Sequence, residues 1–241
     1  MPRIFLPYSE LQNKIITISG EKARYITSVL RCVSGDIINI TDDKGNSYSA
    51  VILSTTRKEI RVEITGKQVI NTESSLDITL LQGLLKGEKM DFVIQKSVEL
   101  GVNKIIPVIT ERSQVRETKK LLRWKKIAEE ASRQSGRSVL PEILQALKFE
   151  DIFTGSNHAS TTGLIFWEQS RSSLSELLNG LGTIDKLSLF TGPEGGFSEK
   201  EVNLASENGF IVASLGKRIL RAETAAISAV SIIQYRLGDI G

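Results

Sequence analysis

Two glycine-rich corners near the C-terminus constrain the fold most, because each follows an apolar run and precedes a helix signal. The first corner, residues 191–197 (TGPEGGF), is followed by Ser198, which begins the Ser-x-x-Glu pattern of a capping box. The second corner, residues 215–224 (LGKRILRAET), leads into the apolar-periodic stretch 225–235. Two successive strand–loop–helix units predict an α/β domain built on a parallel sheet.

The composition of the first corner indicates what kind of ligand it could hold. Glycine lets backbone N–H and C=O groups approach a ligand closely, and Pro193 stiffens the turn. The corner lacks the spacing of a phosphate-binding P-loop, and Glu194 would repel a phosphate. A neutral or cationic nucleotide-like ligand is therefore favoured. Taken singly, each corner is equally consistent with an ordinary αβ turn whose glycines serve the backbone.

Composition excludes several classes of function. With 241 residues, 40% of them hydrophobic, the chain can bury the cores of one or two domains. A single cysteine and a single histidine argue against a disulfide framework and a multi-ligand metal site. We predict that Cys32 is a small core residue and that His158 is a solvated loop residue. No secretion signal or membrane-spanning run is evident, so we expect a cytoplasmic protein.

Residues 1–70 have the pattern of a small β-barrel. Short stretches with one apolar face each predict strands, and one helix is predicted at residues 21–31. Closure into a barrel would leave no open strand edges. A polar, turn-rich segment at 71–75 is the predicted linker. The predicted strands are residues 4–6, 14–18, 36–41, 47–53 and 59–66.

Residues 76–241 alternate between predicted strands and predicted helices. This alternation is typical of a parallel sheet with helices on both faces. The predicted strands are residues 77–82, 104–108, 163–167, 187–191 and 210–215. The predicted helices are residues 89–100, 121–135, 173–178, 199–208 and 222–235.

A basic stretch at residues 112–137 suggests contact with a polyanion. It holds nine lysines and arginines against three glutamates, in a chain whose net charge is only +3. A solvated helix face with internal ion pairs would have the same composition. The nine basic residues are Arg112, Arg116, Lys119, Lys120, Arg123, Lys125, Lys126, Arg133 and Arg137.

Taken together, the two corners resemble the signature of the ribosomal RNA small subunit methyltransferase E family, a branch of the SPOUT methyltransferases. Other segments agree with this resemblance and extend it over nearly the whole chain. They are Leu30-Arg31 with Gly35-Asp36, residues 96–102 (KSVELGV), Ile106-Pro107 with residues 110–113 (TERS), and residues 124–137 (WKKIAEEASRQSGR) with Pro141.

The resemblance implies both a fold and an activity. It implies an RNA-binding PUA-like β-barrel at residues 1–70 and a SPOUT methyltransferase domain with a deep trefoil knot at residues 76–241. The implied reaction transfers a methyl group from S-adenosyl-L-methionine to N3 of a uridine in 16S ribosomal RNA. The implied partners are that RNA within the assembled 30S subunit and a second copy of the chain, bound through the C-terminal domain. The outer face of the apolar helix 222–235 is the expected dimer surface.

The resemblance also assigns residues to roles, with the loops after Phe166, Thr191 and Leu215 meeting in one pocket. The implied cofactor-binding residues are Phe166, Trp167, Glu168, Thr191, Gly192, Pro193, Glu194, Gly195, Gly196, Leu215, Gly216, Ile219, Leu220, Arg221, Thr224 and Ala225. The implied RNA-binding residues are Arg3, Arg24, Arg31, Lys96, Arg112, Arg116, Arg133 and Arg137. Residues 22–25 (KARY) depart from the family, which usually carries a histidine-bearing segment there.

Methylation of uridine N3 also requires the loss of the N3 proton, so an enzyme must stabilise the developing uridine anion or accept that proton. Arg221 is the first candidate for anion stabilisation, because a guanidinium stays charged and offers several donors. Thr224, three residues later, would lie on the same side of a helical turn. Glu223 and Glu194 are candidate bases, although each could instead accept hydrogen bonds at a helix start.

The sequence is also consistent with other functions. A related methyltransferase could act on a different RNA base or on a ribose 2′-oxygen with the same pocket residues. A non-catalytic ribosome-assembly protein could bind RNA with this fold and no cofactor. A dinucleotide-binding enzyme would need G-x-G-x-x-G after its first strand, and residues 82–87 (QGLLKG) do not match that pattern.

Overall fold

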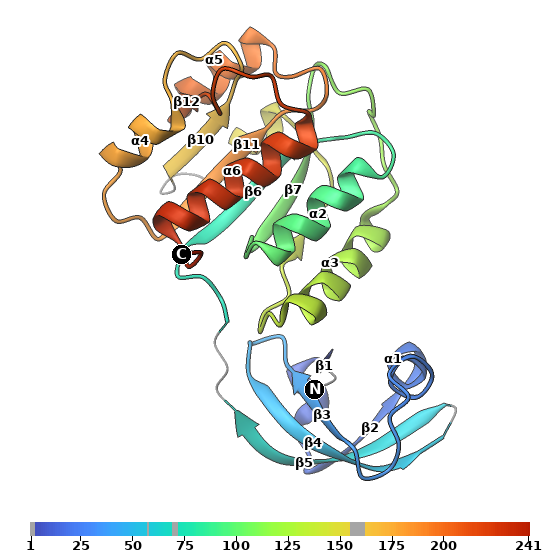
Figure 1. Ribbon diagram of the computed structural model, residues 1–241. Helices are drawn as coiled ribbons and strands as arrows, with labels where there is room; N and C mark the ends of the chain where they lie inside the picture. Colours follow the sequence, from blue (N-terminus) through green and yellow to red (C-terminus); the bar gives the residue numbers. More distant parts are fainter. Residues whose placement is uncertain (1–2, 57, 69–71, 155–161) are drawn as a thin grey trace. The chain divides into compact units, whose positions relative to one another are not determined.

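The computed structural model describes residues 3–56, 58–68, 72–154 and 162–241 (Figure 1). The chain divides into two compact units, one formed by Met1–Glu73 with Ser132–Leu140 and the other by Ser74–Ala131 with Pro141–Gly241. His158, predicted to be a solvated loop residue, lies outside the described residues, as does Asn71 at the start of the predicted linker.

The first unit is built on a five-stranded sheet with the order β1-β3-β4-β5-β2. β1 runs parallel to β3, and the other pairings are antiparallel. Among the described residues the ladder ends at β1 and β2, whereas we predicted a closed barrel. Short edge strands limit the exposed ladder, and β1 has only three residues. The strands are β1 (Arg3–Phe5), β2 (Ile15–Ser19), β3 (Ile37–Thr41), β4 (Ser47–Thr55) and β5 (Glu59–Gln68).

Alternating side chains of these strands form one core. Ile16 and Ile18 of β2 and Ile60 and Val62 of β5 are buried on the same side of the sheet, as a two-residue period requires. Cys32 is buried in this core as a free thiol, which confirms its prediction as a small core residue.

The predicted helix at residues 21–31 is interrupted. The structure has a short α1 (Gly20–Arg24) that runs into a single π-helical turn, η2 (Tyr25–Val29). The segment then ends at Arg31, whose φ of 55° is left-handed. The apolar spacing that predicted this helix does not distinguish an α-helix from the wider π-turn. Another short element, the 3₁₀ helix η1 (Tyr8–Leu11), was not predicted.

The second unit is built on a parallel sheet with the order β12-β10-β11-β6-β7-β8, and β9 also pairs with β7. The five predicted strands are present, but the two-residue strands β8 and β9 were missed because such short segments carry no period. The strands are β6 (Asp77–Gly83), β7 (Lys104–Ile109), β8 (Glu142–Ile143), β9 (Leu147–Lys148), β10 (Thr162–Phe166), β11 (Lys186–Thr191) and β12 (Phe210–Ala213).

Neighbouring residues of each central strand face two separate cores. Leu80 and Leu189 point into a core that they share with α2, α3, α4 and α6, while Leu81 and Phe190 point into a core on the other face with α5 and η3. Figure 1 shows α2 and α6 lying across the same face of the sheet. The helices are α2 (Lys89–Glu99), α3 (Leu121–Ser135), η3 (Glu150–Phe153), α4 (Leu174–Gly180), α5 (Glu199–Glu207) and α6 (Ala222–Leu237).

This strand order gathers three loops at one edge of the sheet. β10 lies between β11 and β12 and runs parallel to both, so all three strands end at the same edge. Ligand sites in open α/β sheets lie beyond the carboxyl ends of the strands. Among the described residues, no helix has the length and apolar character needed to cross a membrane.

Candidate functional site

The glycine-rich loop after β11 packs against the end of β6 and is hydrogen-bonded to it. The buried Gln82 side chain accepts a hydrogen bond from the Thr191 hydroxyl at 2.7 Å and donates to the Gly83 carbonyl at 2.9 Å. Gly83 packs closely against Pro193. A Cβ added at Gly83 would lie only 2.5 Å from the Pro193 nitrogen, so only glycine allows this contact. β6 therefore fixes the position in which the loop leaves the sheet.

The Glu194 side chain ties this loop to the start of α2. One carboxylate oxygen, Oε1, accepts hydrogen bonds from the Lys86 amide at 3.2 Å and from the Lys89 ammonium at 3.1 Å. Burial alone would raise the pKa of Glu194. Hydrogen bonds from its own amide, Lys89 and Lys86 outweigh that effect and hold the pKa below its usual value. Glu194 is thus an ionised group at the side of the loop.

The second corner leaves β12 through a tight turn and ends at the first turn of α6. The Ser214 hydroxyl accepts from the Gly216 amide at 3.1 Å, and Gly216 has a φ of 110°, a left-handed value that favours glycine. Arg221 is the N-cap residue of α6, but its side chain makes no capping bond. Its guanidinium therefore plays no part in starting the helix.

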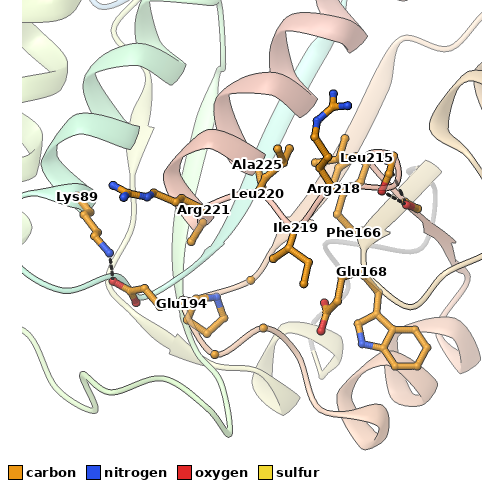
Figure 2. Close-up of a pocket in the computed structure, with 18 residues that line it drawn as sticks. Lys89, Phe166, Glu168, Glu194, Leu215, Arg218, Ile219, Leu220, Arg221 and Ala225 are labelled. Atoms are coloured by element: carbon orange, nitrogen blue, oxygen red, sulfur yellow. Dashed lines mark hydrogen bonds and ion pairs between the residues drawn. The ribbon is translucent and has the colours of Figure 1, made fainter.

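The three loops and the start of α2 line an open cavity of about 360 Å³ (Figure 2). Figure 2 shows Lys89, Glu194 and Arg221 on one side of the cavity, and Phe166 and Glu168 on the other. Ile219 is 87% exposed, which is unusual for so large an apolar side chain. The lining residues are Lys89, Phe166, Trp167, Glu168, Gly192, Pro193, Glu194, Gly195, Gly196, Ser214, Leu215, Gly216, Arg218, Ile219, Leu220, Arg221, Ala222 and Ala225.

The structure brings together most of the residues that the resemblance placed in one pocket. Two of them do not line it: Thr191 is fully buried against Gln82, and Thr224 is exposed at the start of α6. Glu223 also lies outside the lining set, with its carboxylate 4.0 Å from the Lys89 ammonium.

Four lining residues were missed: Lys89, Ser214, Arg218 and Ala222. Three of them are close in sequence to predicted residues, so a wider window around the second corner would have included them. Lys89 is different, because it lies 105 residues from Glu194. Its position at the start of a predicted helix was visible in the sequence, but nothing there linked it to the loop.

The lining side chains carry mixed charge. Three are cations (Lys89, Arg218 and Arg221) and two are carboxylates (Glu168 and Glu194). Lys89 is engaged by Glu194, whereas the Arg221 guanidinium makes no hydrogen bond or ion pair among the described residues. No group of three or more potential metal ligands occurs in the part of the chain that the structure describes. The cavity lining thus offers both polar and charged groups to a ligand, and the Arg221 guanidinium is a cation that could face negative charge there.

The predicted RNA-contacting residues have different environments. Arg24, Arg31, Arg112 and Arg116 are exposed, whereas Arg3, Lys96 and Arg133 are half-buried. The Arg3 guanidinium donates to the Gly136 and Arg137 carbonyls, the Lys96 ammonium pairs with Glu99 at 2.9 Å, and the Arg133 guanidinium lies 4.2 Å from the centre of the Tyr25 ring.

Arg137 was predicted to contact RNA, but the structure buries it inside the first unit. Its side chain is only 4% exposed, and its guanidinium is paired with the Glu73 carboxylate. A buried arginine whose donors are committed to a carboxylate has no free face for a phosphate. These contacts favour a structural role for Arg137 over the predicted RNA contact.

Two families of known domains match the chain. An RNA methyltransferase domain matches residues 72–234, and an RNA methyltransferase PUA domain matches residues 18–65. The chain is 34% identical to the ribosomal RNA small subunit methyltransferase E of Buchnera aphidicola from Schizaphis graminum, over 100% of this chain and 98% of that protein. It is 30% identical to the Bacillus subtilis protein of the same name, over 98% and 97% of the two chains.

A solved structure extends the similarity to three dimensions. The ribosomal RNA small subunit methyltransferase E of Neisseria gonorrhoeae, solved with bound S-adenosyl methionine, superposes with a TM-score of 0.90. The two sequences are 34% identical, and the match covers 100% of each chain. Similarity that runs through both units and along nearly the full length of each relative shows that this chain belongs to the ribosomal RNA small subunit methyltransferase E family.

Proposed function

We propose that this protein methylates N3 of a uridine in 16S ribosomal RNA, with S-adenosyl-L-methionine as the methyl donor. The observation that carries the proposal is the cavity between the two glycine-rich corners, in a chain that belongs to this family. The cytoplasm, where ribosomal RNA is found, is the proposed place of action. The assembled 30S subunit is the proposed form of the substrate.

The cavity has the chemistry that an adenosyl cofactor requires. The loop formed by residues 192–196 offers backbone amides and carbonyls at close range, since three of its five residues are glycine. Leu215, Ile219 and Leu220 supply apolar side chains for an adenine ring. A ring bound there would cover the exposed Ile219 and remove its apolar surface from water. We propose that the predicted residues that line the cavity bind the cofactor, and that Thr191 supports the loop from below.

The bound sulfonium supplies an activated methyl group, and this chain's residues supply position and charge. Arg221 lines the cavity, and we propose that its guanidinium stabilises the anion that forms at the uridine base as its N3 proton leaves. We propose structural roles for the two glutamates. Glu223 lies outside the cavity beside Lys89, and the ionised Glu194 is held by Lys86 and Lys89, with a lowered pKa that makes it a poor proton acceptor.

Each of the two units has its own proposed function. We propose that the first unit, a PUA-like domain with exposed Arg24 and Arg31, binds RNA, and that the second unit carries the reaction. Arg112 and Arg116, both exposed, begin the basic stretch of the second unit. We also propose that the second unit is threaded as the trefoil knot of SPOUT methyltransferases.

The assignment can be tested with small ribosomal subunits from cells that lack the gene. The purified protein should transfer tritiated methyl groups from S-adenosyl-L-methionine to these subunits, and mass spectrometry of the digested RNA should find N3-methyluridine. Binding of the cofactor without transfer would contradict an enzymatic role. A methylated ribose or another methylated base would replace the uridine N3 assignment while keeping the enzyme class.

We also propose that the protein is a symmetric dimer through the outer face of α6. Ile232 and Tyr235 are exposed there, on a helix whose inner face is already buried in the core. Exposed apolar and aromatic residues grouped on one helix face are typical of subunit contacts. Light scattering at micromolar concentration should give twice the chain mass of 26.6 kDa. A mass near that of one chain would contradict the proposal.

A further inference from the structure

The turn that follows β7 lies next to the proposed cofactor loop and is held by several hydrogen bonds of its own side chains. Thr110 and Ser113 are both buried, and the Ser113 hydroxyl accepts a hydrogen bond from the Thr110 amide at 3.1 Å. Their hydroxyl oxygens lie 2.8 Å apart and share a further hydrogen bond. The Arg116 guanidinium donates to the Thr110 carbonyl at 2.8 Å and also to the Glu111 carbonyl. The turn is therefore closed by its own side chains.

The same turn is anchored to the helix that follows the cofactor loop. The Glu111 amide donates to the Glu201 carboxylate at 2.8 Å. The other oxygen of Glu201 accepts from the Ser198 amide at 2.9 Å, as part of the capping box that begins α5. One buried carboxylate thus holds both the turn and the end of the loop that runs from β11 to α5.

Arg112, in the middle of this turn, touches the cofactor loop directly. A Cβ added at Gly195 would lie 2.9 Å from the Arg112 Cβ and 3.1 Å from the Arg112 carbonyl oxygen, so only glycine allows this approach. The Arg112 guanidinium donates through Nη1 to the Gly195 carbonyl at 3.3 Å. Among the described residues this is its one hydrogen bond, and the side chain is exposed. A guanidinium carries five N–H donors, so most of them face solvent.

We propose that Arg112 is a positioning residue that couples RNA binding to cofactor binding. Its free N–H groups bind an RNA phosphate while Nη1 holds the Gly195 carbonyl, so that bound RNA fixes the loop in its cofactor-binding position. The inference rests on the proposed function, since it needs both ligands. By linkage, the factor by which RNA raises cofactor affinity equals the factor by which the cofactor raises RNA affinity.

The coupling can be measured with S-adenosylhomocysteine, the unreactive product, and small ribosomal subunits from cells lacking the gene. Tritiated S-adenosylhomocysteine should bind the wild-type protein about fivefold or more tightly when the subunits are saturating. In Arg112→Ala that factor should fall to less than about twofold, because the bridge between phosphate and loop is lost. Arg112→Lys keeps the positive charge but lacks the planar guanidinium that can hold two partners at once. Its RNA affinity should therefore change little, whereas RNA should no longer raise its cofactor affinity.

Lys125→Ala is the matched control, since Lys125 is an exposed cation of the same basic stretch without a bond to the loop. It should keep the full coupling factor, whatever it does to RNA affinity. The inference would be overturned if RNA did not raise the cofactor affinity of the wild type, or if Arg112→Ala kept the full coupling factor. It would also be overturned if Arg112→Ala and Lys125→Ala lowered the coupling factor equally. If Arg112→Ala does not fold, Arg112→Lys carries the same test. Absence of any cofactor binding by the wild type would instead overturn the proposed function.

Discussion

Replacing Arg221 by alanine should lower the methylation rate by about 100-fold or more, the usual effect of removing a donor that stabilises an anionic transition state. Its affinity for S-adenosylhomocysteine should change by less than about threefold, because the proposed cofactor contacts lie mainly in the two loop backbones. The side chain makes no capping bond to α6, so alanine leaves the start of that helix intact. Single-turnover rates on unmethylated small subunits and calorimetric titration with S-adenosylhomocysteine separate the two effects.

Arg218→Ala is the matched control for this prediction. Arg218 also lines the cavity with an exposed guanidinium, and it lies three residues before Arg221 on the same corner. If general positive charge were enough, both variants would lose activity equally. A large loss in Arg221→Ala together with a loss below about tenfold in Arg218→Ala would assign the stabilisation to one guanidinium. Equal losses of rate and affinity in Arg221→Ala would count against it.

The sequence predicted the long helices and the central strands of residues 76–241 well, because these elements are periodic. The helix at residues 121–135 and the capping box at Ser198 are confirmed, and both depend only on local patterns. The order of the strands could not be predicted from local patterns. β11 lies between β10 and β6, although more than one hundred residues separate it from β6. No local pattern specifies such a pairing, so only the family resemblance implied that the loops meet.

Single long-range contacts explain most of what the sequence could not predict at the site. The sequence could not decide between the candidate roles of Glu194, because its partners Lys86 and Lys89 belong to a distant segment and resemble any other surface lysines. Glu73 was read only as part of a polar linker, and Arg137 as one more cation of the basic stretch. A charged residue looks the same in sequence whether it meets solvent, a phosphate or a buried partner.

The second large effect is expected in the first unit, where Arg137→Met should lower the free energy of unfolding by about 3 kcal/mol or more. Glu73 is 12% and Arg137 is 4% exposed, and the Arg137 Nε donates to the Glu73 carboxylate at 3.0 Å. The other Glu73 oxygen accepts from the Ser138 amide at 2.8 Å and the Val139 amide at 3.0 Å. Removing the Arg137 cation leaves the Glu73 carboxylate buried without its countercharge. The loss of stability is therefore larger than the net stability that the intact pair provides.

The contribution of Glu73 should also depend on pH. Burial would raise its pKa, but hydrogen bonding and charge from Arg137, with the Ser138 and Val139 amides, outweigh burial and hold the pKa below its usual value. A carboxyl whose folded pKa is lowered stabilises the fold at pH values above its unfolded pKa. That stabilisation is lost as the pH falls through the folded pKa. The stability advantage of wild type over Glu73→Gln should therefore be constant near neutral pH and shrink below about pH 4.

The two units can be followed separately, because both tryptophans, Trp124 and Trp167, belong to the second unit. In Arg137→Met, circular dichroism should show an early transition at a melting temperature lowered by about 10 °C or more. Tryptophan fluorescence should change mainly in the later transition. Glu63→Gln is the matched control, since it breaks the exposed Lys14–Glu63 pair of the same unit and should cost less than about 1 kcal/mol. If Arg137→Met melted like Glu63→Gln, the buried pair would not be what holds residues 132–140 to the first unit.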